Sequence, residues 1–238
     1  MRRYNRLISI LSVMVFITSC SVFISPDDSP ESASHGYVKG ITPSSSEFFE
    51  ERRYPTIQAN WPGEGGDKTW LGRNLGAIDS PRNSVDDRAA VSGWYFQFNH
   101  KQGYYHSGTD LFPAWEHSGI REDSEWKPEN DPCRQLLGNR WRLPTLIELG
   151  NFLHATQERG GLQQGNRTDA FNSQLRLHAA GELHSYDGSL TNRGVHGRYW
   201  SSDQYSEDRG ESLTFDAGGS STYASNKAFG RPVRCIYD

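Results

Sequence analysis

Three cysteines, at positions 20, 133 and 235, limit most strongly how this chain of 238 residues can fold. Cys20 follows an apolar N-terminal segment, whereas Cys133 and Cys235 lie far apart in the rest of the chain. In an exported protein disulfides persist, so Cys133 and Cys235 could pair if Cys20 serves another purpose. Such a bond would close a loop of about 100 residues, for which a chain-entropy model gives about 4–5 kcal/mol. The alternative is two free thiols.

Residues 1–19 predict a secretory signal peptide. Three arginines precede an apolar run from Leu7 to Ile17, the order of charge and hydrophobicity found in export signals. The run is too short for a membrane-spanning helix. Its last residues, Ile17-Thr18-Ser19-Cys20, resemble the lipobox of bacterial lipoproteins. That resemblance implies cleavage before Cys20, acylation of Cys20 with fatty acids such as palmitate, and a lipid anchor in the bacterial outer membrane, facing the periplasm or the cell surface.

Two alternatives to the lipobox remain open. The segment could be an ordinary signal peptide with a chance cysteine, or Arg2-Arg3 could belong to a twin-arginine signal, although the usual apolar pair does not follow. Cleavage would remove three arginines and leave 22 basic against 29 acidic side chains. Because nucleic acids bind basic surfaces, a nucleic-acid partner is not expected. The membrane contact is expected to come from the lipid rather than from a polybasic patch.

The rest of the chain divides into a tether and a folded domain. Residues 20–52 are dominated by serine, proline and acids, as in SPDDSPESASHG and TPSSSE, and predict a flexible tether. Residues 53–238 are expected to form one domain. Only 34% of the whole chain is apolar, yet 12% is aromatic and 24 residues are glycine. This balance favours a loop-rich fold with a core built on large rings.

Local patterns predict several elements of that domain. Residues 69–75 and 93–98 read as short strands, and alternation places Trp94, Phe96 and Phe98 on a core face. Tyr95 and Tyr105 could form an exposed stacking platform. A capping box, Thr145 with Glu148, starts a helix that Gly160-Gly161 is expected to end. The C-terminal region alternates like strands, with Leu213 and Phe215, and then Val233, Cys235 and Tyr237, on single faces.

Six short motifs occur in an order that resembles one bacterial family. They are Trp70 to Leu75 (WLGRNL), Gly93 to Phe98 (GWYFQF), Asp131-Pro132-Cys133, Trp141 to Glu148 (WRLPTLIE), Tyr199 to Ser202 (YWSS) and Val233-Arg234-Cys235. The family is the major paralogous domain first named from Fibrobacter succinogenes, together with its relative, the C-terminal domain of Legionella collagen-like adhesin. The resemblance covers residues 69–238, about 70% of the chain.

The resemblance implies an α+β fold of the C-type-lectin-like kind. Such a fold has a twisted, mostly antiparallel sheet, one or two helices and long loops. It further implies that Trp141 and Trp200 are core residues and that the last strand returns beside the start of the domain. A disulfide between Cys133 and Cys235 is implied as well, in agreement with the cysteine count.

No residue pattern predicts catalysis. The eight histidines lack the spacing of zinc motifs, and there is no G-x-S-x-G elbow. The protein is therefore not expected to be an enzyme or to carry a cofactor. Calcium stays open as an alternative, with Asp86-Asp87 and Asp203 as candidate ligands. Pro128 to Asp131 is acidic but not in the order that calcium-dependent lectins use.

Two polar segments near the C-terminus predict a binding surface. Residues 203–210 and 217–226 are rich in Tyr, Ser, Gly, Asn and Asp, which resembles the composition of antibody binding loops. Tyr199-Trp200 is expected to end a core strand, after which the chain turns outward into these loops. A glycan or protein ligand is expected to bind there. The candidate residues are Ser202, Asp203, Tyr205, Asp208, Arg209, Ser221, Tyr223 and Asn226.

Other functions are left open. The C-terminal region distantly resembles the variable end of proteins that retroelements diversify on a C-type-lectin fold. A rival interpretation is a structural or assembly subunit of a surface fibre. A third is a hydrolase that acts on polysaccharides.

Overall fold

The computed structural model describes residues 37–42, 50–116 and 118–238. The predicted signal peptide, residues 1–19, and the predicted lipidation site, Cys20, lie outside the described residues. The described chain combines antiparallel sheets with a few short helices, which is compatible with the predicted α+β class. No described helix has the length and hydrophobicity needed to cross a membrane.

The strands and helices of the described residues are short. The strands are β1 (Tyr37–Thr42), β2 (Glu50–Gln58), β3 (Thr69–Leu71), β4 (Tyr95–Phe96), β5 (Gly103–His106), β6 (Leu111–Phe112), β7 (Trp141–Arg142), β8 (Glu182–Leu183), β9 (Leu190–Thr191), β10 (Gly197–Ser206), β11 (Arg209–Phe215), β12 (Ser220–Asn226) and β13 (Ile236–Tyr237). The helices are α1 (Ala89–Ser92), α2 (Pro132–Leu137), α3 (Leu146–His154) and α4 (Arg167–Asn172), with one 3-10 turn at Gln157–Arg159.

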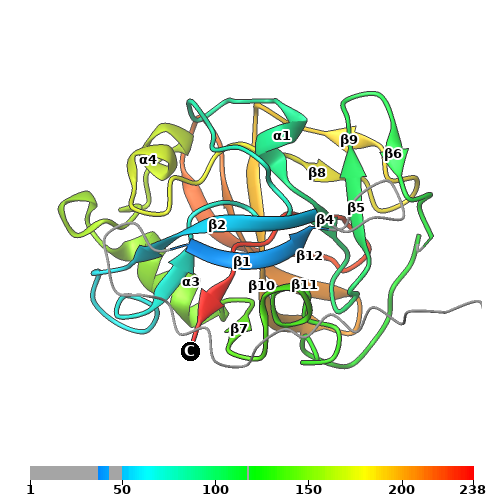
Figure 1. The fold of residues 1–238 in the computed structure, drawn as a ribbon, viewed down its shortest axis with the longest axis horizontal. Helices are drawn as coiled ribbons and strands as arrows, with labels where there is room; N and C mark the ends of the chain where they lie inside the picture. The colour runs from blue at the N-terminus through cyan, green and yellow to red at the C-terminus, as the bar shows by residue number, and fades with distance from the viewer. Residues whose placement is uncertain (1–36, 43–49, 117) are drawn as a thin grey trace, which may run out of the picture.

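These strands form four antiparallel sheets. Their orders are β1-β2-β3-β13-β7, β10-β11-β12, β4-β5-β6 and β8-β9. In Figure 1 the β1–β2 hairpin crosses in front of the middle of the molecule, and β10–β12 run behind it. The small sheets β4–β6 and β8–β9 lie together at the upper right of that view, and α3 lies at the lower left.

The β1–β2 hairpin differs from the predicted tether. The prediction places a tether over residues 20–52, but β1 and the start of β2 fall inside that range and pair from Tyr37↔Pro55 to Thr42↔Glu50. The physical reason lies further along β2, where Tyr54 is fully buried and its hydroxyl accepts the N–H of Gly76 at 3.0 Å. Because Tyr54 anchors β2 in the core, the strand extends outward from it and gives β1 a partner.

The last strand, β13, lies between β3 and β7. Ile236 pairs with Trp70 and Tyr237 pairs with Trp141, so the C-terminus returns beside the start of the domain, as predicted. The predicted alternation of burial in this segment is wrong, because Arg234 and Ile236 are as buried as their neighbours. Both faces of the segment are covered by other elements.

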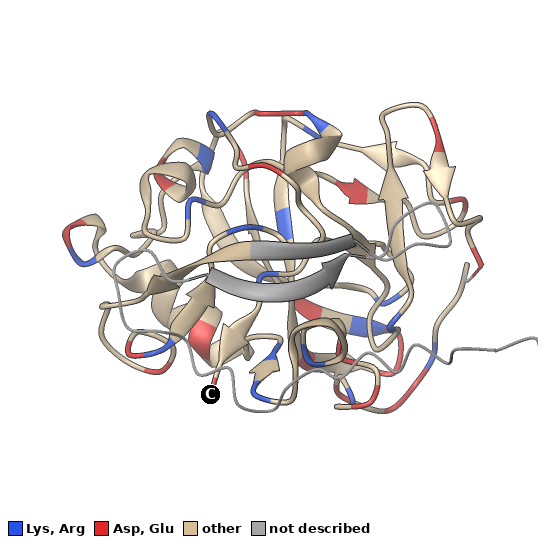
Figure 2. Cartoon of the chain, viewed as in Figure 1, with Lys and Arg blue, Asp and Glu red and all other residues tan. Residues whose placement is uncertain are grey.

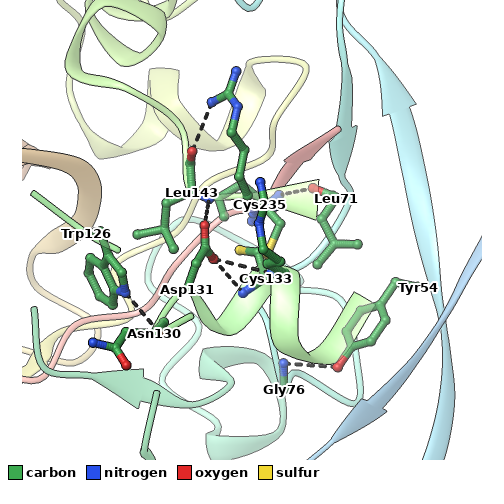
Figure 3. The surroundings of a disulfide bond; sticks show 12 residues. Tyr54, Leu71, Gly76, Trp126, Asn130, Asp131, Cys133, Leu143 and Cys235 are labelled. Carbon is green, nitrogen blue, oxygen red and sulfur yellow. Dashed lines mark hydrogen bonds between the residues drawn. A yellow bond between two sulfur atoms is a disulfide. The ribbon is translucent and has the colours of Figure 1, made fainter. Parts of the chain in front are cut away.

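The disulfide between Cys133 and Cys235 is present and joins α2 to the residue that precedes β13 (Figure 3). The alternative of two free thiols is therefore wrong for these residues. Asp131, the N-cap of α2, accepts the N–H groups of Cys133 at 2.8 Å and of Leu143 at 2.9 Å. The N–H of Leu71 donates to the carbonyl of Cys235 at 2.9 Å. The bond thus joins two segments that the hydrogen bonds already hold in place.

The core is built from large rings, as the composition predicts. Trp200 and Trp141 are both buried. The Trp200 indole N–H donates to the carbonyl of Phe96 at 2.8 Å, and its ring meets Phe98 edge-on at 5.5 Å. Tyr95 is also fully buried, with its hydroxyl donating to Ala180 O at 2.7 Å, so the stacking platform proposed for Tyr95 is wrong.

Helix α3 begins as predicted and ends earlier. Thr145 and Glu148 form the predicted capping box, and Leu149, Phe152 and Leu153 are buried. The helix ends at His154, and Gly160, with φ of 79°, closes the following 3-10 turn rather than the helix. The helix packs against the sheet β10–β11–β12, which carries the candidate binding residues.

Candidate binding surface

The candidate residues lie mainly on strands, not on the two loops that the sequence predicts. Residues 203–206 are the end of β10, and residues 220–226 are β12. Only residues 207–208 and 216–219 connect the strands. The composition is misleading because Ser, Thr and Tyr also suit a strand at a sheet edge, and β11 between them supplies the buried partners Leu213 and Phe215.

The register of the sheet decides which side chains reach its surface. Ser212 of β11 lies opposite both Trp200 and Tyr223, and Leu213 lies opposite Tyr199. Directly opposite residues point to the same face of a sheet. Both faces of β10 and β11 are therefore covered around Trp200 and Leu213, whereas side chains emerge from β12 and from the irregular end of β10.

Four of the eight candidates are engaged inside the protein. Ser202 bonds through its backbone to Pro144 and Trp126. The Asp203 carboxylate accepts the N–H of Leu146, the first residue of α3, at 2.7 Å. Asp208 accepts the Ser206 hydroxyl at 2.7 Å, which lowers the pKa of its carboxyl group. Asn226 Oδ1 accepts the N–H of Ala228 at 2.8 Å. These contacts stabilise turns and a helix end.

The other four candidates are exposed, as Asn226 is, but they have no side-chain partner among the described residues. Tyr205 is 64% exposed and Tyr223 is 61% exposed, and Arg209 and Ser221 are exposed too. None of their side chains forms a hydrogen bond or ion pair within the part of the chain that the structure describes. Their hydroxyl and guanidinium groups are therefore available to a ligand.

The four exposed residues form two patches. Tyr205 and Arg209 lie on the two sides of the β10–β11 turn, where Ser206 pairs with Arg209. We name Tyr205 and Arg209 the turn patch. Ser221 and Tyr223 share one face of β12, and we name them the edge patch. Alternation along β11 places Arg209 and Ser212, the partner of Tyr223, on opposite faces. One ligand would reach both patches only by extending around the sheet.

A lysine binds the loop of residues 121–125, which contains three acidic residues and is bonded to the β10–β11 turn through Glu122 and Glu207. Lys227 is fully buried, and its ammonium group donates to the carbonyls of Glu122 at 2.5 Å and Ser124 at 3.2 Å and to Gln204 Oε1 at 3.0 Å. Burial lowers the pKa of Lys227, while surrounding carboxylates oppose that shift. The ammonium group also lies 5.0 Å from the Phe98 ring. The Lys227 ammonium group therefore links this loop to the core.

Two of the three aspartates kept open as calcium ligands have other partners, and the third, Asp87, is exposed. Asp86 forms an ion pair with Arg88 at 2.7 Å, and Asp203 caps α3. The hydrogen bond from Arg88 is the main reason why the pKa of Asp86 lies below its usual range. Within residues 37–42, 50–116 and 118–238, no three His, Cys, Asp or Glu side chains gather in a metal-binding group.

A buried ion pair lies on the same face of the sheet as the edge patch. The Arg231 guanidinium group lies 4.4 Å from the Trp200 ring and donates to the hydroxyls of Ser212 and Ser225, both at 2.7 Å. Its Nε donates to Glu182 at 3.0 Å. Burial lowers the pKa of Arg231 to about 10, so it stays charged at neutral pH. Arg231 thus ties β8, β11 and β12 together.

Sequence reasoning missed this ion pair. Glu182 also accepts from Arg198 of β10, so one carboxylate serves two arginines. Charged residues are rarely fully buried unless paired, and nothing in the spacing of these three residues shows that they meet. The only available signal was the position of Arg231 in the segment that leads into the buried last strand.

His178 is buried as well, but unlike Arg231 its side chain forms no hydrogen bond among the described residues. It is fully buried, and neither ring nitrogen forms a hydrogen bond within the described residues. Burial is the largest cause and the nearby Arg234 cation the second cause of a pKa lowered to about 3. The imidazole therefore stays neutral in the folded protein at any mildly acidic pH.

This lowered pKa predicts acid sensitivity. Between about pH 6.5 and 3 the unfolded chain binds a proton at His178 that the folded chain does not, so stability falls as the pH falls. From pH 7 to pH 5 we expect the wild type to lose about 2 kcal/mol more than His178→Gln. Urea unfolding of both proteins across this range measures the difference. If the stability of the two proteins changes equally with pH, the prediction is wrong, and His178 has a hydrogen-bonding partner or contacts solvent.

In the part of the chain drawn in colour in Figure 2, positively and negatively charged residues are interspersed along the ribbon. Comparisons with protein-family models, with curated proteins and with solved structures each give no match to this chain.

Proposed function

We propose that this chain is an exported bacterial lipoprotein, anchored through Cys20, that binds a macromolecular ligand without catalysis. The folded part would be a C-type-lectin-like domain. Its sheet β10–β11–β12 would present the ligand-binding surface. The ligand would be a glycan or a protein, and neither nucleic acid nor a cofactor enters the proposal.

The exposure of Tyr205 and Tyr223 is the observation that carries this proposal. Both residues are more than half exposed, although β10 and β11 are covered on both faces around Trp200 and Leu213. Tyrosine offers a large contact area at a low cost in conformational entropy, and its hydroxyl adds a hydrogen bond. A rigid base reduces the entropy lost on binding further. The covered strands and the disulfide provide such a base.

The two patches suit different ligand groups. In the turn patch, Arg209 could pair with a carboxylate or sulfate group of the ligand, and Tyr205 could stack on a sugar ring or fill a pocket of a protein. In the edge patch, Tyr223 could stack in the same way, and the Ser221 hydroxyl could donate or accept a hydrogen bond. Ser202, Asp203, Asp208 and Asn226 would keep these residues in place.

Substitution of both tyrosines tests the proposal. The protein, with Cys20→Ser to give a soluble product, is screened on arrays of glycans and of host proteins. For a ligand found there, we expect Tyr205→Ala with Tyr223→Ala to lower the affinity at least about tenfold, as loss of central aromatic contacts does. Calorimetry or surface plasmon resonance measures the change.

Tyr186 gives a matched control. It is 76% exposed and lies in the β8–β9 connection, away from both patches. Tyr186→Ala should therefore leave the affinity unchanged. Equal affinity of the double variant and the wild type would remove the proposed surface. Turnover on a panel of polysaccharides would instead support the hydrolase interpretation.

A further inference from the structure

The outer edge of β12 is open. Among the described residues, β12 pairs with β11 and with no second strand. The Ser212 hydroxyl donates to the carbonyl of Tyr223 at 2.7 Å, so this carbonyl points toward β11. Because backbone groups alternate along a strand, the N–H and carbonyl groups of Thr222 and Ala224 point away from β11. They form the free edge of the sheet.

This edge lacks the features that normally prevent strand addition. Proteins protect sheet edges with lysine, proline, bulges or very short strands. The sequence of β12 is SSTYASN, seven residues without a charge, a proline or a glycine. Its seven pairs with β11 run without a register shift, whereas the β10–β11 ladder has two. Ser221, Thr222 and Tyr223 are all exposed.

The strand also matches itself in the antiparallel direction. A two-fold axis through Tyr223 would place Thr222 opposite Ala224 of a second copy, Ser221 opposite Ser225 and Ser220 opposite Asn226. Thr222 and Ala224, whose backbone groups point outward, would then form the hydrogen-bonded pairs that an antiparallel ladder requires. The two tyrosines would form a cross-strand aromatic pair, and no like charges would meet.

We propose that β12 is the interface of a two-fold dimer, in which a second copy of this chain extends the sheet to β10-β11-β12-β12-β11-β10. A two-fold interface uses the same surface on both copies and therefore closes without forming a filament. Pairing along one seven-residue edge buries little area, so the dimer is weak and depends on protein concentration. This inference does not rest on the proposed ligand-binding function.

Cysteine crosslinking tests the register. All proteins carry Cys20→Ser, and Cys133 and Cys235 are already bonded to each other. In the dimer the two Tyr223 Cα atoms form a non-hydrogen-bonded pair about 4.5 Å apart, which suits a disulfide. We expect Tyr223→Cys to give a covalent dimer under mild oxidation with copper phenanthroline. Ser221→Cys should not, because the two copies of residue 221 would lie about 14 Å apart.

A proline variant tests the backbone pairing. Thr222→Pro removes an N–H that points outward, which edge strands tolerate, so the monomer should keep its circular dichroism spectrum and melting temperature. Sedimentation at about 5–100 μM should show the wild type approaching twice the monomer mass and Thr222→Pro staying a monomer. A monomeric wild type at every concentration, a Thr222→Pro dimer, or equal crosslinking at residues 221 and 223 would each overturn the proposal. If the wild type is a monomer at every concentration, a strand from a different protein remains as the alternative occupant of the edge.

Discussion

Replacing both Cys133 and Cys235 by alanine is expected to lower the free energy of unfolding by about 4–5 kcal/mol. The bond joins residues 102 positions apart, and a crosslink across a loop of that length restricts the unfolded chain by about this amount in the chain-entropy model. Both sulfur atoms also lie in the cluster that contains Trp141 and Leu71, so alanine leaves unfilled space there. Urea unfolding without reductant measures the loss.

Two further samples isolate the effect of the bond. Cys20→Ser removes a cysteine that takes no part in the bond, and it should unfold like the wild type. Wild type in reductant should lose nearly as much stability as the double alanine variant, because both lack the crosslink. A loss of less than about 1 kcal/mol would mean that the hydrogen bonds of Asp131 and of the Cys235 carbonyl already hold the two cysteines in place. It would also mean that the unfolded chain gains little freedom when the disulfide is removed.

Sequence rules predicted the parts of the fold that depend on residues close together in the sequence or on a covalent bond. The capping box of α3 needs only Thr145 and Glu148, three residues apart. The burial of Trp200 and Trp141, by contrast, was expected from the family resemblance, and both side chains are buried. The cysteine pair followed from counting, since only one pairing remains if the chain is exported and Cys20 is lipidated.

The polar strands could not be predicted in this way. In β12 every residue except Tyr223 and Ala224 is Ser, Thr or Asn. Ser and Asn favour turns, whereas Thr favours strands, so the composition predicts neither clearly. The register with β11 decides between the two, and it depends on Leu213 and Phe215 being buried against α3. As a result, the candidate surface is part of a sheet, and four of its eight residues have partners inside the protein.

The buried arginines were missed for a different reason. Arg231 and Arg234 lie three positions apart, the first just before and the second within a segment that reads as an alternating strand, and the alternation predicts an exposed Arg234. In the structure, Arg234 donates to the carbonyls of Leu71 at 3.1 Å and Leu175 at 2.7 Å. These acceptors lie far away in the sequence. A buried charge is possible only where distant segments supply its partners, and no local pattern contains that information.

Removing the carboxylate of Glu182 is expected to destabilise the domain by about 3–5 kcal/mol, the range observed when one member of a buried ion pair is lost. Glu182→Ala leaves Arg231 charged and almost completely buried, with only the hydroxyls of Ser212 and Ser225 and the faces of two rings as partners. Arg198 loses its acid as well, but it is only partly buried and can reach water. Urea unfolding at pH 7 measures the loss.

An exposed ion pair provides the comparison. Glu207 lies 3.8 Å from Arg121, and both side chains are mostly exposed, so Glu207→Ala should cost less than about 1 kcal/mol. Replacing Glu182 by Leu together with Arg231 by Met should recover part of the loss, because no buried charge then remains. Equal stability of Glu182→Ala and the wild type would mean that Arg231 reaches water through a movement of β12. Arg231 donates to Ser225 of β12 and to Ser212 of β11. A movement of β12 would break the first of these bonds, so backbone hydrogen exchange should then be faster in β12 than in β10. That pattern would show that β12, at the edge of the sheet, opens before the core does.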